Sequence, residues 1–327
     1  MKLPRRAVLQ LATAAAALPA SAWIAGAESY PARPVHMIVD LPPGLAPDVL
    51  ARLVGPLLSQ RLGGEIVVEN KPGAGGNIGA EYVAHAAPDG YTLLVMISGN
   101  AAGGALYPNL TFNFARDIAA VAFLGYTPFV VAINPSIPVK TIPELIAHAK
   151  ANPGKLNFAS PGAGTAPHLA FELFRMITGV DIVHVPYREA NSGLASVIGG
   201  ATQMMFSIIS IAKSQIDGGT ARGIGVTSLT PSALVPDLPA IAQSGLPGFE
   251  VIGWNGFVAP KATPPRIIAK LNAAILDALA TAEVREKLKA AGYDTAATNS
   301  PQEFADFIAA DTKKWLNLAT RININAN

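Results

Sequence analysis

Four loops rich in glycine, serine and proline hold the residues best suited to binding chemistry. They cover residues 40–48, 98–101, 160–165 and 186–191, and each follows a short β-rich run. In open α/β sheets, ligands bind at the carboxyl ends of the strands, where such loops lie. Glycine lets a ligand approach the backbone, and N–H groups at helix N-termini favour anions. We therefore expect a small-anion site there, although for residues 160–165 a plain strand-to-helix turn is the alternative.

The familiar motifs of catalysis, nucleotide binding and metal binding are missing from the sequence. It contains no His-Glu-x-x-His, no P-loop, no EF-hand loop and no Gly-x-Ser-x-Gly. The glycine run at residues 73–79 misses the Gly-x-Gly-x-x-Gly spacing, so it is better interpreted as a structural loop that enters a helix. The five histidines lack metal-ligand spacing, and there is no cysteine. We expect neither a metal nor a cofactor, and nothing here demands an enzyme.

The composition is that of a globular protein with balanced charge. The chain has 327 residues, of which 50% are hydrophobic and 14% charged, with 24 Lys and Arg against 22 Asp and Glu. This length is enough for two domains, and the apolar content excludes a disordered chain. The net charge of +2 leaves no electrostatic footprint for nucleic acid, so we expect no nucleic-acid partner.

The first 27 residues have the anatomy of a signal peptide. A basic start with Lys2, Arg5 and Arg6 precedes an apolar run over residues 7–18, and Ala-Gly-Ala at residues 25–27 offers a cleavage site. We expect export to the periplasm by the Sec or the twin-arginine route, since the Arg pair suits the second route but its neighbours do not. No later window is long and apolar enough to span a membrane.

Strands and helices alternate along most of the chain, which favours α/β layers. Residues 121–133 are interpreted as buried strands joined by a turn at Gly125 and Pro128. A helical tail follows, in which Ser300, Pro301 and Glu303 mark the start of a helix. The other expected strands cover residues 35–39, 66–69, 91–97, 156–159, 182–185, 203–206, 223–227 and 251–259. The other expected helices cover residues 48–62, 78–87, 141–151, 168–178, 194–198, 264–279 and 283–291.

Seven segments together resemble one protein family. They are residues 30–39, 68–79, 87–94, 153–158, 183–187, 245–250 and 259–264. In this order they resemble the Bug-type solute-binding proteins of tripartite tricarboxylate transporters. The resemblance implies a periplasmic protein with an α/β, two-lobed periplasmic-binding-protein fold (type II, Venus flytrap) and a ligand cleft between the lobes. We expect a monomer, although the sequence does not fix the oligomeric state. It also implies a small carboxylate ligand, delivery to the membrane subunits of a transporter, no catalysis and no metal.

The resemblance also implies a division of the chain and a set of ligand-binding residues. Residues 28–130 and 250–327 would form the first lobe, and residues 131–249 the second. The first lobe would supply Leu41, Pro42, Pro43, Gly44, Pro47, Asp48, Ser98 and Asn100. The second lobe would supply Ser160, Gly162, Gly164, Thr165, His168, Tyr187, Arg188, Phe206 and Ser207.

Several of these positions depart from the family pattern. The first loop has Pro and Ala where the family has a glycine-rich run ending in Thr-Asp, and Ser207 stands where an Asp is usual. The pocket has lost polar donors and an acid, which favours an aromatic or longer aliphatic carboxylate. Its oxygens would accept from the N–H groups of Gly44, Gly164 and Thr165 as the lobes close. Arg188 is a candidate counter-ion, with a solvent-facing position as the alternative. Tyr187 and Trp254 are candidates for an aromatic wall, with the core as the alternative for both and the expected place of Trp254.

Two other functions stay open. A ligand sensor that presents the same carboxylate to a membrane kinase would have the same fold. An exported serine hydrolase would need one of the loop serines beside His168 or His184, and no motif supports it.

Overall fold

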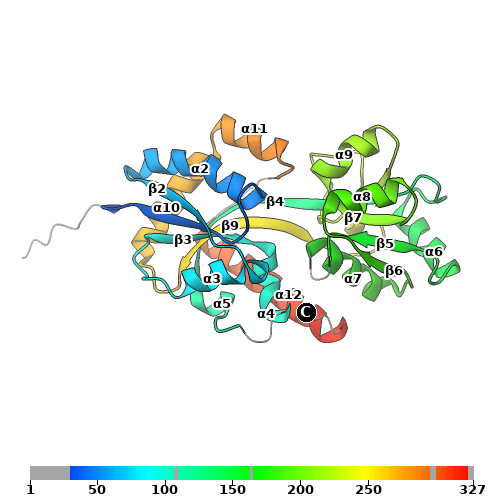
Figure 1. Cartoon of the computed structure of the whole chain (residues 1–327), viewed down its shortest axis with the longest axis horizontal. Helices are drawn as coiled ribbons and strands as arrows, with labels where there is room; N and C mark the ends of the chain where they lie inside the picture. Colours follow the sequence, from blue (N-terminus) through cyan, green and yellow to red (C-terminus); the bar gives the residue numbers. More distant parts are fainter. Residues whose placement is uncertain (1–29, 107–109, 163–164, 295–299, 323–327) are drawn as a thin grey trace, which may run out of the picture.

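The computed structural model describes residues 30–106, 110–162, 165–294 and 300–322. The expected signal peptide and Gly164 lie outside these ranges. Among the described residues, no helix is long and apolar enough to cross a membrane. Two lobes lie side by side, and two long strands run between them, β4 (Ile118–Ile133) and β9 (Ile252–Pro260) (Figure 1).

The first lobe is a five-stranded sheet with helices on both faces. Its order is β2 (Ile66–Asn70), β1 (Val35–Val39), β3 (Thr92–Ile97), β9 and β4, with the first three strands parallel. Side chains of β1 alternate between the two faces, since Val35, Met37 and Val39 share one core cluster and Ile38 another. One face packs against α2 (Ala46–Leu62), α10 (Pro265–Leu279) and α11 (Ala282–Ala290). The other packs against α3 (Asn77–Ala84), α4 (Ser98–Leu106), α5 (Phe114–Asp117) and α12 (Pro301–Ile322).

The second lobe repeats this layering around a shorter sheet. Its order is β8 (Arg222–Val226), the end of β4, β7 (Met204–Ile208), β5 (Asn157–Ser160) and β6 (Val183–Pro186). Helices α6 (Ile142–Ala151) and α7 (Ala166–Thr178) cover one face, and α8 (Ala190–Ile198) and α9 (Ile209–Asp217) the other. Short 3₁₀ turns lie at Ala74–Gly76 and Ile241–Gln243.

The turn expected within residues 121–133 is wrong, because β4 is one continuous strand. Pro128 pairs with Ile252 of β9, and Phe129 already pairs with Ile208 of β7. The missing N–H of Pro128 therefore falls where the strand changes partners. Gly125 marks a close backbone approach, since a Cβ there would lie 2.9 Å from the Asp294 carbonyl oxygen. The division of the chain at residues 130 and 250 into domains stays a prediction.

Two local expectations have opposite outcomes. The helix start at Ser300 is confirmed, with the Glu303 N–H donating to Ser300 Oγ at 3.2 Å and the Ser300 N–H to Glu303 Oε2 at 2.9 Å. The loop expected at residues 98–101 is wrong, because α4 begins at Ser98, directly after β3 ends at Ile97. Ser98 and Asn100 therefore lie in the first turn of a helix.

Candidate ligand-binding site

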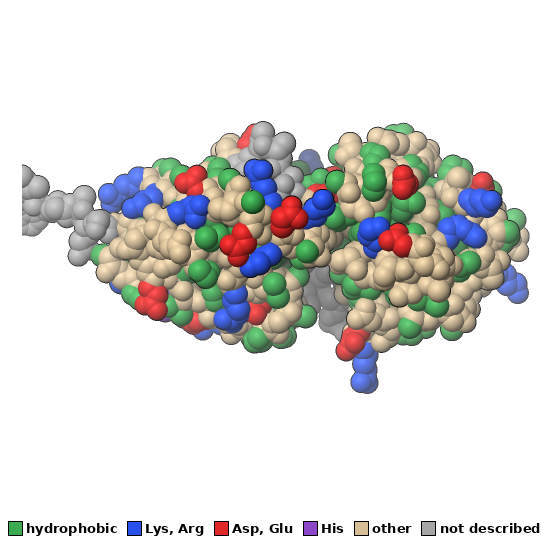
Figure 2. Space-filling view, turned by 90° about the horizontal axis from the view of Figure 1, so that it is seen from above, with side chains coloured by type: hydrophobic (Ala, Val, Ile, Leu, Met, Phe, Trp, Pro, Cys, Tyr) green, Lys and Arg blue, Asp and Glu red, His purple; other side chains and the backbone are tan. Residues whose placement is uncertain are grey.

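The strand directions place the predicted loops of the two lobes at sheet ends that are directed toward the hinge. In the first lobe, the carboxyl end of β3 lies at the hinge, where Ile97 pairs with Asn255, and β1 runs parallel to β3. In the second lobe, β7 ends opposite Phe129, and β5 and β6 run parallel to it. The carboxyl ends of both sheets therefore face each other, and the surface is hollowed between the lobes (Figure 2).

The loop that follows β1, residues 40–48, is the first-lobe loop, and hydrogen bonds to the Asp48 side chain fix its shape. This residue is 3% exposed, and its carboxylate accepts from the Gly44 N–H at 2.9 Å and from Asn70 Nδ2 at 3.0 Å. Arg52 Nε lies 3.0 Å from the same group, and its hydrogen bond holds the pKa of Asp48 below the usual range. Asp48 therefore shapes the loop, and the Gly44 N–H, expected to reach the ligand, already has an acceptor.

The remaining predicted residues of this loop differ in exposure. Pro47 is buried at the start of α2, and Leu41 is half-buried. The predicted residues Pro42, Pro43 and Gly44 are exposed, as are Leu45 and Ala46 beside them. This surface is apolar and has little side-chain freedom.

A buried acid that was not predicted as a site residue lies at the end of β1. Asp40 is 0% exposed, and neither of its carboxylate oxygens has a hydrogen-bond partner among the described residues. Burial raises its pKa to about 7, although the side chain of Asn100 opposes this. A Cβ at Gly76 would lie 2.5 Å from Asp40 Oδ2 and 3.0 Å from Asn100 Nδ2, so both side chains pack against this glycine. The sequence signal that could have identified Asp40 as a site residue is its position directly after an apolar strand.

Asn100 fixes the beginning of α4. Its side chain is 0% exposed, and its Oδ1 accepts from the Ile97 N–H at 2.8 Å. Ser98, two residues earlier, is half-buried. Asn100 is therefore a support behind the groove, and Ser98 lies nearer the surface.

In the second lobe, the described residues of the loop after β5 are also joined to one another by hydrogen bonds. Ser160 Oγ lies 2.6 Å from His184 Nε2 and accepts from the Gly162 N–H at 3.1 Å. Thr165 Oγ1 donates to the Gly162 carbonyl at 2.8 Å, and the Thr165 N–H reaches the same oxygen at 3.4 Å. The expected Thr165 donor is thus engaged within the loop.

Two histidines pack beneath this loop. The rings of His168 and His184 stack with centroids 4.1 Å apart, and His168 Nε2 lies 3.6 Å from Glu172 Oε1. Burial lowers the pKa of each histidine to about 4, so both are neutral at pH 7. His168 is 6% exposed and supports the loop from below.

The other predicted residues of the second lobe divide between core and edge. Phe206 is 0% exposed and packs against Phe158, Phe174 and Phe249, so it is a core residue. Ser207 is also 0% exposed, and Tyr187 donates to or accepts from Ser196 Oγ at 2.5 Å.

Arg188 is exposed and follows β6 at the groove edge. Trp254 is 1% exposed and donates to Asp311 Oδ2 at 2.9 Å, which agrees with the core position expected for it.

Comparison with known proteins identifies the class. Residues 50–324 match the TctC family, whose description is tripartite tricarboxylate transporter family receptor. The protein BugT of Bordetella pertussis is 36% identical over 307 residues, which cover 93% of this chain and 92% of BugT. The chain belongs to this receptor family, as the sequence resemblance predicts.

Two solved structures have the same fold. An R. palustris protein solved with adipate is 30% identical, with a TM-score of 0.74 over 90% of this chain and 99% of its own. MatC from Rhodopseudomonas palustris, solved with bound malate, is 31% identical, with a TM-score of 0.72 over 89% and 100%. The predicted two-lobed binding-protein fold is confirmed.

Proposed function

We propose that this chain is an exported, periplasmic solute-binding receptor that captures a small carboxylate between its lobes. It would deliver this ligand to the membrane subunits of a tripartite tricarboxylate transporter. The observation that carries the proposal is that the strand ends of both lobes are directed toward the hinge formed by β4 and β9. Membership of the receptor family and the two relatives solved with adipate and malate support it.

Helix N-termini supply the positive potential for a carboxylate. Helices α4, α7 and α8 begin directly after β3 or within six residues of the ends of β5 and β6. The N–H groups in the first turn of a helix have no acceptor within the helix, so each of these helix starts favours an anion at the carboxyl ends of the strands, although Pro167 of α7 has no N–H to offer. These donors replace the Gly44 and Thr165 groups, which are engaged within their own loops. Arg188 adds a full positive charge at the edge of the second lobe.

The ligand would have an apolar body. Pro42 and Pro43 are exposed on the first-lobe loop, and Leu45 is 47% exposed beside them. A longer aliphatic or an aromatic carboxylate would cover these side chains on closure, whereas a short hydroxy acid would not.

Calorimetry on the mature protein tests this function. The ligands would be malate, adipate, benzoate and phenylacetate, and the variants Arg188→Gln and, as a control on an exposed arginine of α11, Arg285→Gln. We expect adipate or an aromatic acid to bind more tightly than malate, and Arg188→Gln to weaken that binding by roughly tenfold. The absence of binding by every carboxylate would contradict the proposal. Signalling through a kinase instead would appear as ligand binding without uptake in transporter-containing vesicles.

The distance between Ser160 and His184 favours a hydrolase as the second candidate. However, Ser160 is 0% exposed, and its Oγ is held by the loop backbone as well as by the histidine. We therefore propose that this pair is structural. Ester and amide turnover abolished by Ser160→Ala would contradict this.

A further inference from the structure

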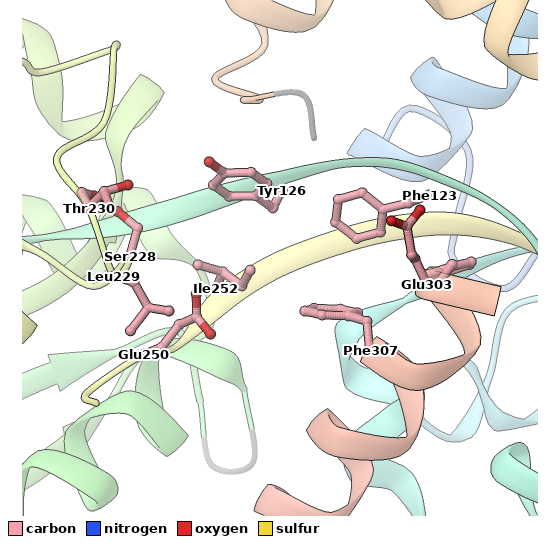
Figure 3. A pocket seen from close by; sticks show the side chains of 10 residues that line it. Phe123, Tyr126, Ser228, Leu229, Thr230, Glu250, Ile252, Glu303 and Phe307 are labelled. Carbon is pink, nitrogen blue, oxygen red and sulfur yellow. Dashed lines mark hydrogen bonds between the residues drawn. The ribbon is translucent and has the colours of Figure 1, made fainter. Parts of the chain in front are cut away.

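A cavity of about 440 Å³ lies at the hinge (Figure 3). Phe123 and Tyr126 come from β4 and Ile252 from β9, so two of its walls are the strands that join the lobes. Helix α12 forms a third wall, and the segment after β8 a fourth. The lining residues are Phe123, Tyr126, Ser228, Leu229, Thr230, Glu250, Ile252, Glu303, Phe304 and Phe307.

This cavity is separate from the predicted carboxylate site. None of its lining residues belongs to the set predicted to bind the carboxylate. In the second lobe, β8 and β6 lie at opposite ends of the strand order, with β4, β7 and β5 between them. The segment after β8 is therefore several strands away from the loops that follow β5 and β6.

The chemistry of the lining also differs from that of an anion site. The walls are mainly aromatic and aliphatic, and both charged lining residues are acids, Glu250 and Glu303. Glu303 accepts hydrogen bonds from Ser300 in the cap of α12. The Glu250 carboxylate accepts no hydrogen bond among the described residues.

Lys314, whose charge acts on Glu250, is already paired with Asp311. Lys314 Nζ lies 2.6 Å from Asp311 Oδ1 and donates only to the backbone carbonyl of Glu250, at 3.4 Å. Burial raises the pKa of Glu250, and the nearby charge of Lys314 opposes this rise without cancelling it. A cationic ligand would give the Glu250 carboxylate a directly hydrogen-bonded partner, which Lys314 does not.

We propose that this hinge cavity binds an amphipathic organic cation, an aromatic or aliphatic amine, with its ammonium on Glu250 and its apolar body among Phe123, Phe304 and Phe307. Carboxylates are repelled by the two acids and bind elsewhere. An amine in this cavity contacts both lobes, because Leu229 belongs to the second lobe and Phe307 to a helix of the first.

Calorimetry with three probes of similar size tests the proposal: 2-phenylethylammonium, 2-phenylethanol and 3-phenylpropionate. The variants are Glu250→Gln, which removes the charge at nearly constant volume, and Glu283→Gln, a control on an exposed acid of α11. We expect the amine to bind the unchanged protein and Glu283→Gln equally, and Glu250→Gln roughly tenfold more weakly. The alcohol should bind weakly, and equally to all three proteins.

A second variant guards against a folding defect in Glu250→Gln. Leu229 is 47% exposed, so Leu229→Arg should fold and place a fixed cation at the cavity edge. It should abolish amine binding and leave carboxylate binding in the groove unchanged. Absence of amine binding, equal binding by Glu250→Gln, or competition between the amine and a groove carboxylate would each overturn the proposal.

Discussion

The Gly44 N–H donates to the Asp48 carboxylate at 2.9 Å, and this bond holds the first-lobe loop in one conformation. Asn70 and Arg52 bond to the same carboxylate, so three elements depend on one acid. The loop is thus preorganised before any ligand arrives, which reduces the entropy lost on binding.

Replacing this acid should loosen the loop. Asp48→Ala leaves the Gly44 N–H and the Asn70 amide without an acceptor, so we expect a loss of about 1–3 kcal/mol in the free energy of unfolding. Carboxylate affinity should fall as well. Urea unfolding and calorimetry check both, with the exposed Asp237→Ala as the control. Unchanged stability in Asp48→Ala would show that the carboxylate does not hold the loop.

The buried Asp40 should make stability fall as pH rises. Its pKa is about 7 in the folded chain against 3.8 in the unfolded chain, so the folded state binds more protons between these values. The free energy of unfolding therefore decreases from about pH 4 to pH 7, by at most about 4 kcal/mol from this group.

Asp40→Asn should remove this dependence. We expect the variant to be more stable than the unchanged protein at pH 8 and nearly equal to it at pH 4. Urea unfolding at a series of pH values checks this. Parallel pH curves for the two proteins would contradict the assignment.

The histidine pair should act in the opposite direction. The folded pKa values of His168 and His184 are about 4, below the ordinary value of 6.5, because burial disfavours their charged forms. The unfolded state therefore binds more protons in this window, and stability is lost as pH falls from 6.5 to 4. His168→Phe keeps a ring to stack on His184 and should reduce the slope, whereas His85→Phe, at an exposed position, should not. Equal slopes in both variants would count against this origin of the pH dependence.

Much of the fold could be predicted from local patterns. The cap of α12 and the order of strands and helices follow from residue types at short spacing, which fix local backbone geometry. The continuity of β4 could not be read in this way, because Gly125 and Pro128 are turn residues in most contexts. In this chain Gly125 lets the backbone at residue 294 approach β4 closely, and Pro128 lies where the partner of β4 changes from β9 to β7. Both features depend on contacts between segments that are distant in the sequence.

The sequence predicts which loops form the candidate site, but not which of their atoms are available to a ligand. The positions of residues 40–48 and 160–165 at strand ends follow from the α/β pattern. Which N–H groups are free depends on side chains such as Asp48 that fold back on their own loop. Phe206 lies in the core because its strand faces α7, a relationship that one sequence does not reveal.

Closure of the lobes by a carboxylate is the most direct test of the central claim. The chain has no cysteine, so Gln60→Cys on α2 and Ser214→Cys on α9 give one exposed label site in each lobe. Energy transfer between the two dyes should increase when adipate or an aromatic acid is added, and stay constant with the corresponding neutral diol or alcohol. A carboxylate that binds by calorimetry without any change in energy transfer would contradict the account.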